Sequence, residues 1–307
     1  MRWAAFARSG LVFVALLYAF CTLPAEAQQS ATPSSTVREF EHLASPALGG
    51  DLLYSLYLPP GYGTDERRYP VLYLLHGAEG NHLEWLHTGY VRETLDAMIA
   101  DGRVAPMIVV MPDGGGNSWY VDSKDVGGPG NYESAISVDL VAHIDATLRT
   151  KAEPRFRAVG GLSMGGFGAL RFAFQQPFRY VAAASFSGAF WARVKPDTVL
   201  GDWAQRIFQG AFGRPFDTAR FLAQSPLTMV DGLKDAPHPP AVFLTVGDRD
   251  RYKLYNDTFE LFHHMRELGL PVEMRMTGGD HEWETWAAEL PDALLFFDRE
   301  FKPGDRS

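Results

Sequence analysis

A serine framed by glycines is the residue of this sequence best suited to nucleophilic chemistry. Ser163 lies in the pattern Gly-x-Ser-x-Gly, with Gly161 and Gly165 on either side. This pattern is typical of a serine at a sharp turn from a strand to a helix, where the strained backbone requires small neighbours. The segment Phe156–Val159 is expected to form the buried strand, and Gly166–Phe174 is expected to begin the helix. The spacing therefore predicts a nucleophilic serine, the first requirement for acyl transfer.

Such a serine needs a base that takes its proton and an acid that orients the base. In a nucleophile turn of this kind the acid and then the histidine follow along the chain, each after a later strand. The expected strand Val242–Val246 leads into an acidic loop, and the expected strand Val272–Met276 leads into His281. Of the nine histidines, only His281 both follows the acidic loop and lies at a glycine-rich strand exit, so it is the predicted base.

Two aspartates compete for the position of the acid. Because the chain turns out of its strand at Gly247, the side chain three residues later is better placed to reach the histidine, which favours Asp250. Asp248 remains the alternative and is otherwise a turn residue. Asp280, next to His281, is expected to be solvated or to cap the helix that follows.

Acyl transfer also needs hydrogen-bond donors at the carbonyl oxygen that becomes negatively charged. One is expected from the backbone N–H of Met164, at the start of the helix after the serine. The second is expected from Ala78, in the loop after the apolar run Val71–Leu75. His76 begins this loop, and we expect it to hold the loop by hydrogen bonding.

Neither a metal nor another cofactor is expected. His82, Glu84 and His87 lie close together but lack the His-Glu-x-x-His spacing of a zinc site, so we expect them to line the cleft or face water. The formal net charge is −9 and the chain contains no basic run, which argues against a nucleic-acid partner.

Residues 1–27 have the features of a secretory signal peptide. Arg2 and Arg8 precede the apolar run Leu11–Leu23, which is too short to span a bilayer comfortably. Ala25 and Ala27 supply the small side chains of a cleavage site. We therefore expect a flexible polar leader at 28–36 and a periplasmic or secreted mature protein without a stable membrane anchor.

Strands that alternate with helices predict a doubly wound α/β fold. An antiparallel pair, Val37–Leu43 and Leu52–Leu58, is expected to open the domain. Continuous apolar runs, typical of strands buried on both faces of a parallel sheet, occur at Val71–Leu75, Met107–Met111, Phe156–Val159, Val181–Phe186 and Val242–Val246.

Helices are expected where apolar residues recur every four positions from Ile136 to Leu148, and at Leu254–Leu268. We expect one catalytic domain, 37–307, with a cap-like insertion at about 189–240. The aromatic residues of the cap and of nearby strand ends are Trp85, Trp119, Tyr120, Trp191, Trp203, Phe208, Phe212, Phe216 and Phe221. Two interpretations stay open: these rings stack against an aromatic or carbohydrate-linked acyl group, or they pack the cap onto the domain.

Four motifs occur in order along the chain: Leu74-Leu75-His76-Gly77, Met111-Pro112-Asp113-Gly114, Gly161-Leu162-Ser163-Met164-Gly165-Gly166 and His281-Glu282-Trp283. Together they resemble the esterase D family of serine esterases, over roughly residues 40–301. The resemblance implies an α/β-hydrolase fold, with Ser163, Asp250 and His281 matching the catalytic residues and Ala78 and Met164 matching the oxyanion donors. The Asp280-His281-Glu282-Trp283 segment departs from the Gly-His-Asp-Trp that relatives often have.

That family includes feruloyl and acetylxylan esterases, a tributyrin esterase, S-formylglutathione hydrolase, siderophore esterases and mycolyltransferases. Together with the signal-like segment, the resemblance implies an exported serine carboxylesterase that needs no cofactor. Its substrate is expected to be a small-molecule or carbohydrate-linked ester with an acetyl, feruloyl or short-chain acyl group. Two alternatives remain: an acyltransferase with the same three residues, and a binding module that has lost the chemistry. The sequence does not indicate an oligomeric state.

Overall fold

The computed structural model describes Met1 and residues 34–191 and 202–302. The expected signal peptide lies, apart from Met1, outside the described residues, as do residues 28–33 of the expected leader and 192–201 of the expected cap. Ser35, by contrast, is buried, and its hydroxyl donates to Asp96 at 2.7 Å. The first strand begins at Thr36, so the folded domain begins slightly before the expected end of the leader.

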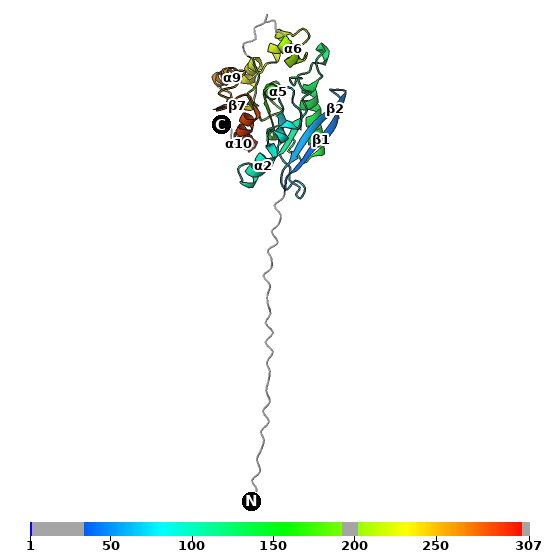
Figure 1. Cartoon of the computed structure of the whole chain (residues 1–307), viewed down its shortest axis with the longest axis vertical. Helices are drawn as coiled ribbons and strands as arrows, with labels where there is room; N and C mark the ends of the chain where they lie inside the picture. The colour runs from blue at the N-terminus through cyan, green and yellow to red at the C-terminus, as the bar shows by residue number, and fades with distance from the viewer. Residues whose placement is uncertain (2–33, 192–201, 303–307) are drawn as a thin grey trace. The chain divides into compact units, whose positions relative to one another are not determined.

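One mostly parallel sheet organises the described part of Pro33–Ser307, in the strand order β1-β2-β4-β3-β5-β6-β7-β8. Figure 1 shows β1 and β2 on one side of this unit and β7 toward the other. The strands are β1 Thr36–Ser45, β2 Gly50–Leu58, β3 Val71–Leu75, β4 Ile108–Pro112, β5 Arg157–Leu162, β6 Ala182–Phe186, β7 Ala241–Gly247 and β8 Val272–Thr277. β2 pairs antiparallel with both β1 and β4, and every other neighbouring pair is parallel. The expected alternation of strands and helices, the opening antiparallel pair and the parallel sheet are confirmed.

Apolar residues cover both faces of this sheet because side chains alternate along a strand. In β3, Val71, Tyr73 and Leu75 belong to one buried cluster, whereas Leu72 and Leu74 belong to the other. The first cluster includes apolar residues of α4, α5 and α9, and the second includes those of α2 and α10. The helices therefore lie on both faces, as the doubly wound arrangement requires.

The helices are α1 Glu84–His87, α2 Val91–Ala100, α3 Tyr132–Ser134, α4 Val141–Thr147, α5 Met164–Gln175, α6 Asp202–Phe208, α7 Thr218–Gln224, α8 Pro226–Met229, α9 Tyr255–Glu267 and α10 Trp283–Phe301. Short 3₁₀ segments are η1 Lys124–Val126, η3 Pro154–Phe156 and η4 Val230–Asp235, and η2 Ala135–Leu140 is a π-helix. The range expected to be helical, 136–148, thus contains η2 and α4, preceded by α3, and the helical structure ends at Thr147. No helix among the described residues is long and apolar enough to cross a membrane.

Candidate active site

Ser163 occupies the single residue between β5 and α5. Its backbone is strained, with φ 53° and ψ −115°. Both flanking glycines are required by close backbone approach: a Cβ at Gly161 would meet the Gly165 carbonyl, and a Cβ at Gly165 would lie 2.5 Å from the His76 carbonyl oxygen. The sharp turn predicted from Gly-x-Ser-x-Gly is therefore present, and it places the hydroxyl at the carboxyl end of the sheet.

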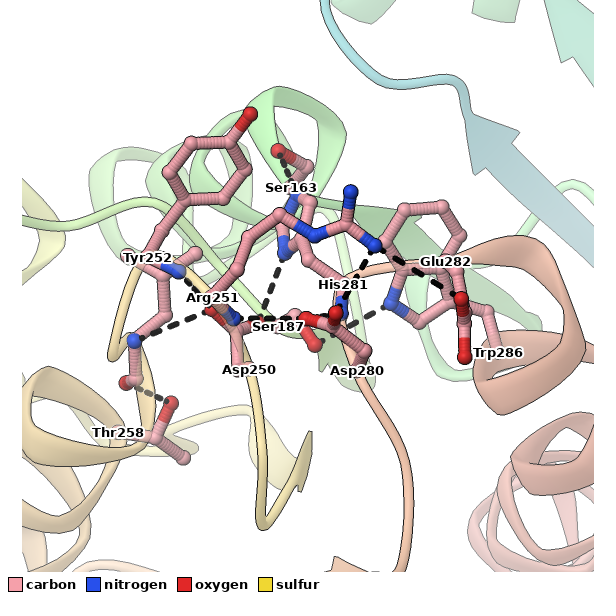
Figure 2. A network of polar contacts seen from close by, with 11 residues as sticks. Ser163, Ser187, Asp250, Arg251, Tyr252, Thr258, Asp280, His281, Glu282 and Trp286 are labelled. Carbon is pink, nitrogen blue, oxygen red and sulfur yellow. Dashed lines mark hydrogen bonds and ion pairs between the residues drawn. The ribbon is translucent and has the colours of Figure 1, made fainter.

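The three predicted side chains lie together at this end of the sheet, joined by hydrogen bonds (Figure 2). His281 Nε2 is 3.0 Å from Ser163 Oγ, and His281 Nδ1 is 2.8 Å from Asp250 Oδ2. The carboxyl group of Asp250 is fully buried, whereas the imidazole is 10% exposed. The other oxygen of Asp250, Oδ1, accepts from the backbone N–H groups of Tyr252 at 2.9 Å and Leu254 at 3.4 Å. These four hydrogen bonds fix Asp250 and His281 relative to each other and to Ser163.

Two aromatic rings hold the imidazole of His281 on its sides. Tyr252 and Trp286 each lie with their ring centroid 4.9 Å from that of His281, at interplanar angles of 88° and 89°. Trp286 is anchored in turn because its Nε1–H donates to Ser187 Oγ at 3.2 Å. The imidazole orientation is therefore set by packing as well as by Asp250.

Among the described residues the alternative acid, Asp248, has no hydrogen bond with His281, and its Oδ1 accepts from the Gly279 N–H at 3.0 Å. Asp280 accepts from the backbone N–H groups of Arg251 and His281, each at 2.7 Å, and pairs with the Arg251 guanidinium at 2.9 Å. This hydrogen bonding with Arg251 lowers the pKa of Asp280 to about 2. Of the two expectations for Asp280, capping of the next helix is wrong, because the N-cap of α10 is Glu282 and none of the described side chains caps this helix. The Asp280 carboxyl group is instead partly exposed and joins the acid loop to the histidine loop through Arg251.

The loop after β3 is held by His76, as expected. His76 Nδ1–H donates to the Gly77 carbonyl and Nε2 accepts from the Gly114 N–H, both at 2.7 Å, which defines a neutral tautomer. Burial lowers the pKa of this histidine and so favours the same neutral form. Tyr120 adds a hydroxyl hydrogen bond to the His76 carbonyl at 3.0 Å.

The two predicted backbone donors lie at the start of α5 and in the loop after β3. Met164 is the first residue of α5, where a helix leaves its N–H groups without intrahelical partners. Ala78 lines the cavity beside Ser163. Within the described residues neither N–H donates to a protein acceptor, so both are available to a bound oxygen.

A cavity of about 540 Å³ opens beside Ser163 and His281. Aromatic lining comes from Trp119, Trp191, Tyr252, Trp283 and Trp286, and charged lining comes from Glu79, Glu84, Arg251, Glu282 and Glu284. The cap rings Phe208, Phe212, Phe216 and Phe221 pack against one another, and three of them also against Trp119 or Phe167.

The aromatic residues singled out from the sequence therefore divide into two groups. Packing of the cap accounts for its four phenylalanines, whereas Trp119 and Trp191 also face the cavity. Trp85 and Tyr120 are buried and do not line it. The side chain of Trp203 lies outside the described residues.

Of the three clustered polar residues, Glu84 does line the cavity. His82 is buried and hydrogen-bonds with Ser55 at 2.9 Å, and the exposed His87 pairs with Glu39 at 3.3 Å. Among residues that the structure describes, no group of three or more His, Cys, Asp or Glu side chains is arranged to hold a metal.

The sequence did not lead us to place Tyr252 or Arg251 in the site, and Trp283 was named only as part of the motif that contains His281. Tyr252 and Arg251 come directly after Asp250, and Trp283 is two residues after His281. Proximity in sequence to the predicted acid and base was therefore the signal that could have found them.

The sheet order, the strained serine turn and the Ser-His-Asp geometry define the class of protein: an α/β-hydrolase with a serine-hydrolase arrangement. Consistent with this, the family model Esterase, described as "Putative esterase", matches residues 45–297. The chain belongs to this family, a group of ester-hydrolysing serine hydrolases within the α/β-hydrolase superfamily.

Two curated Mycobacterium tuberculosis proteins, named Esterase MT1326 and Esterase Rv1288, are each 30% identical over 260 residues, covering 76% of this chain and 53% of theirs. The chain thus spans about half the length of these relatives. A solved ferulic acid esterase is 27% identical with a TM-score of 0.74, over 88% of this chain and 100% of that one. The Staphylococcus aureus fluorophosphonate-binding serine hydrolase FphF shares the fold, with 17% identity and a TM-score of 0.71, over 87% and 98% of the two chains.

Proposed function

We propose that this protein is an exported serine carboxylesterase that works through an acyl-enzyme. The observation that carries the proposal is the continuous hydrogen-bonded series from Ser163 Oγ through His281 to the buried Asp250, beside an open cavity. A serine hydroxyl becomes an effective nucleophile when a correctly oriented base takes its proton. The esterase names of the relatives support the same reaction class.

In the first half of the reaction, His281 Nε2 accepts the hydroxyl proton while Ser163 Oγ bonds to the ester carbonyl carbon. The carbonyl oxygen becomes an oxyanion and accepts hydrogen bonds from the N–H groups of Ala78 and Met164. The bond to the alcohol then breaks, and the alcohol leaves with the proton from His281.

In the second half, His281 takes a proton from water, and the resulting hydroxide attacks the acyl carbon. The bond to Ser163 Oγ breaks, the serine regains its proton and the carboxylic acid leaves. Asp250 keeps Nδ1–H of His281 pointing toward itself throughout and offsets the positive charge of the imidazolium.

For the substrate, we propose an uncharged ester with an aromatic acyl group, of the feruloyl type, linked to a small alcohol or a carbohydrate. Trp191 and Trp283 line the cavity and are partly exposed, so a ring of this kind can stack on them. The likeness to a ferulic acid esterase supports this class. Four glutamates around the cavity disfavour an anionic substrate.

Serine catalysis is tested by replacing Ser163 with alanine. Wild-type protein is expected to hydrolyse methyl ferulate and 4-nitrophenyl acetate and to bind a fluorophosphonate probe covalently, whereas Ser163→Ala is expected to lose labelling and at least about 10³-fold in kcat. Ser185→Ala is a matched control, because Ser185 Oγ is buried in β6 and has no hydrogen-bond partner among the described residues. Equal labelling and turnover in wild type and Ser163→Ala would refute the proposed chemistry.

Export is tested separately by expressing the full chain and sequencing the N-terminus of the mature protein. The signal-like segment predicts that the mature protein begins at Gln28 and is recovered from the periplasm or the medium. Recovery of the chain inside the cell, still beginning at Met1, would contradict it.

A further inference from the structure

Glu84 places a carboxyl group in the wall of the cavity that contains Ser163 and His281. The side chain is partly buried, and within the described residues no N–H or O–H donates to the carboxyl and no basic side chain pairs with it. Burial, with the nearby charge of Asp113, raises the pKa of Glu84. A carboxyl group withdrawn from water without a protein partner costs stability, which a ligand donor would offset.

The position of this carboxyl group is built into the surrounding structure. It lies directly over Gly80, where a Cβ would be only 2.8 Å from Glu84 Cδ and 2.9 Å from His76 Nδ1. The next residue, Trp85, is buried and anchors α1 to β3 by donating its Nε1–H to the Leu75 carbonyl at 3.0 Å. The carboxyl group is therefore held over the loop that presents the Ala78 N–H.

The charges around the cavity indicate which kind of group Glu84 would bind. Glu79, Glu282 and Glu284 also line it, so an anion would be repelled. The Arg251 guanidinium is already paired with Asp280 at 2.9 Å and lies 3.7 Å from Glu282. A cation would have to lose its own hydration at a partly buried site. A neutral hydroxyl group, which donates a strong hydrogen bond to a carboxylate at small desolvation cost, fits best.

We propose that Glu84 determines specificity by accepting a hydrogen bond from a hydroxyl group of the ester substrate. The inference rests on the proposed esterase function. The shared chemistry is a neutral O–H donor, and its two sources are a phenol on the acyl part and a hydroxyl on the alcohol part. A buried polar group that hydrogen-bonds a substrate hydroxyl discriminates strongly against substrates without that hydroxyl, because it is then left unpaired.

The test compares two pairs of esters, each pair differing by one hydroxyl. Methyl ferulate and methyl 3-methoxycinnamate probe the acyl part, and 2-hydroxyethyl butyrate and ethyl butyrate probe the alcohol part. The readout for each pair is the ratio of two kcat/KM values, that of the ester with the hydroxyl divided by that of the ester without it. Glu84→Leu is expected to lower this ratio at least about tenfold in one pair, which identifies the source of the hydroxyl.

Glu84→Gln keeps an acceptor oxygen and is expected to retain most of the ratio. Glu284→Leu is the matched control, because it removes a carboxylate from the exposed rim of the same cavity and is expected to retain the ratio. Glu84→Ala is made in parallel, so that a folding defect in the leucine variant, detected by urea unfolding, leaves the comparison intact.

Equal losses for both members of both pairs would mean that Glu84 only supports the neighbouring loop, and the proposal would be overturned. Unchanged ratios in Glu84→Leu and Glu84→Ala would overturn it as well. Failure of the esterase function itself looks different, since wild-type protein would then hydrolyse none of the four esters and would not be labelled at Ser163 by a fluorophosphonate.

Discussion

Replacing Asp250 with asparagine tests the roles assigned to the acid and the base with almost no change in shape. In the wild type, Asp250 Oδ1 accepts from the N–H groups of Tyr252 and Leu254, and Oδ2 accepts from His281 Nδ1 at 2.8 Å. An asparagine has one acceptor and one donor at these two places. The asparagine oxygen can therefore accept either from the two backbone N–H groups or from His281 Nδ1–H, but not from both sides.

The two backbone donors decide this choice. If the amide oxygen stays at the Oδ1 position, both backbone hydrogen bonds are kept. The reverse orientation loses both, at about 1 kcal/mol each, and places the asparagine NH₂ against the two backbone N–H groups. The amide NH₂ therefore faces His281 Nδ1, which has to become the acceptor. The imidazole proton then moves to Nε2, the atom 3.0 Å from Ser163 Oγ, where it blocks proton removal from the serine.

We expect Asp250→Asn to lower kcat by about 10³ to 10⁴-fold, in line with the cost of a wrong histidine tautomer. That loss corresponds to about 4 to 5.5 kcal/mol of transition-state stabilisation. The assay is steady-state hydrolysis of 4-nitrophenyl acetate, with urea unfolding to show that the variant is folded. Fluorophosphonate labelling should slow in parallel, because it needs the same activated serine.

Asp248→Asn is the matched control, because Asp248 competes for the same role in the sequence but accepts from Gly279 N–H in the structure. We expect it to retain kcat within a few-fold. The reasoning is wrong if Asp250→Asn keeps kcat within tenfold of wild type, or if Asp248→Asn suffers the larger loss.

Two further predictions concern stability. Gly165→Ala should lower the free energy of unfolding in urea by about 1–3 kcal/mol or more, since the added Cβ would meet the Leu75 and His76 carbonyl groups. Gly63→Ala should cost far less, because a Cβ at Gly63 would meet no other part of the described chain within 4 Å. Equal costs would contradict the argument. Because the pKa of Asp280 falls from 3.8 to about 2 on folding, its ionised form stabilises the protein above pH 3.8, and this contribution is lost as the pH falls toward 2. The unfolding free energy of wild type should therefore drop more steeply over that interval than that of Asp280→Asn, and parallel curves would exclude this role.

The central strands were predictable because they are buried on both faces. β3 has the predicted limits, Val71–Leu75, since every residue in it is apolar and buried. The sharp turn at Ser163 was equally predictable from its flanking glycines, because close backbone contact in such a turn leaves no room for a Cβ. Parallel strand order then placed Asp250 and His281 on loops at the same edge of the sheet, which is why residues so distant in sequence could be paired.

Side-chain partners formed by tertiary packing could not be predicted in the same way. The sequence left open whether Glu84 lines the cleft or faces water, because a glutamate before a tryptophan at the start of a four-residue helix suits either place. Asp280 precedes a helix and carries a side chain suited to capping, yet Arg251 from another loop supplies a better partner. Tyr252 and Trp286 flank His281 only because the loop after β7 and helix α10 meet there.

This difference has a consequence for how substrate preference can change in such a domain. Ser163, Asp250 and His281 are held by strand ends and backbone hydrogen bonds, which restrict what can replace the residues around them. Trp191 and Trp283 are held instead by packing against other aromatic rings, and Glu84 is held by the placement of the short helix α1. Substitution of these cavity residues should therefore alter relative kcat/KM values among esters more readily than it alters serine activation. A domain built in this way can keep one reaction while the group it accepts changes.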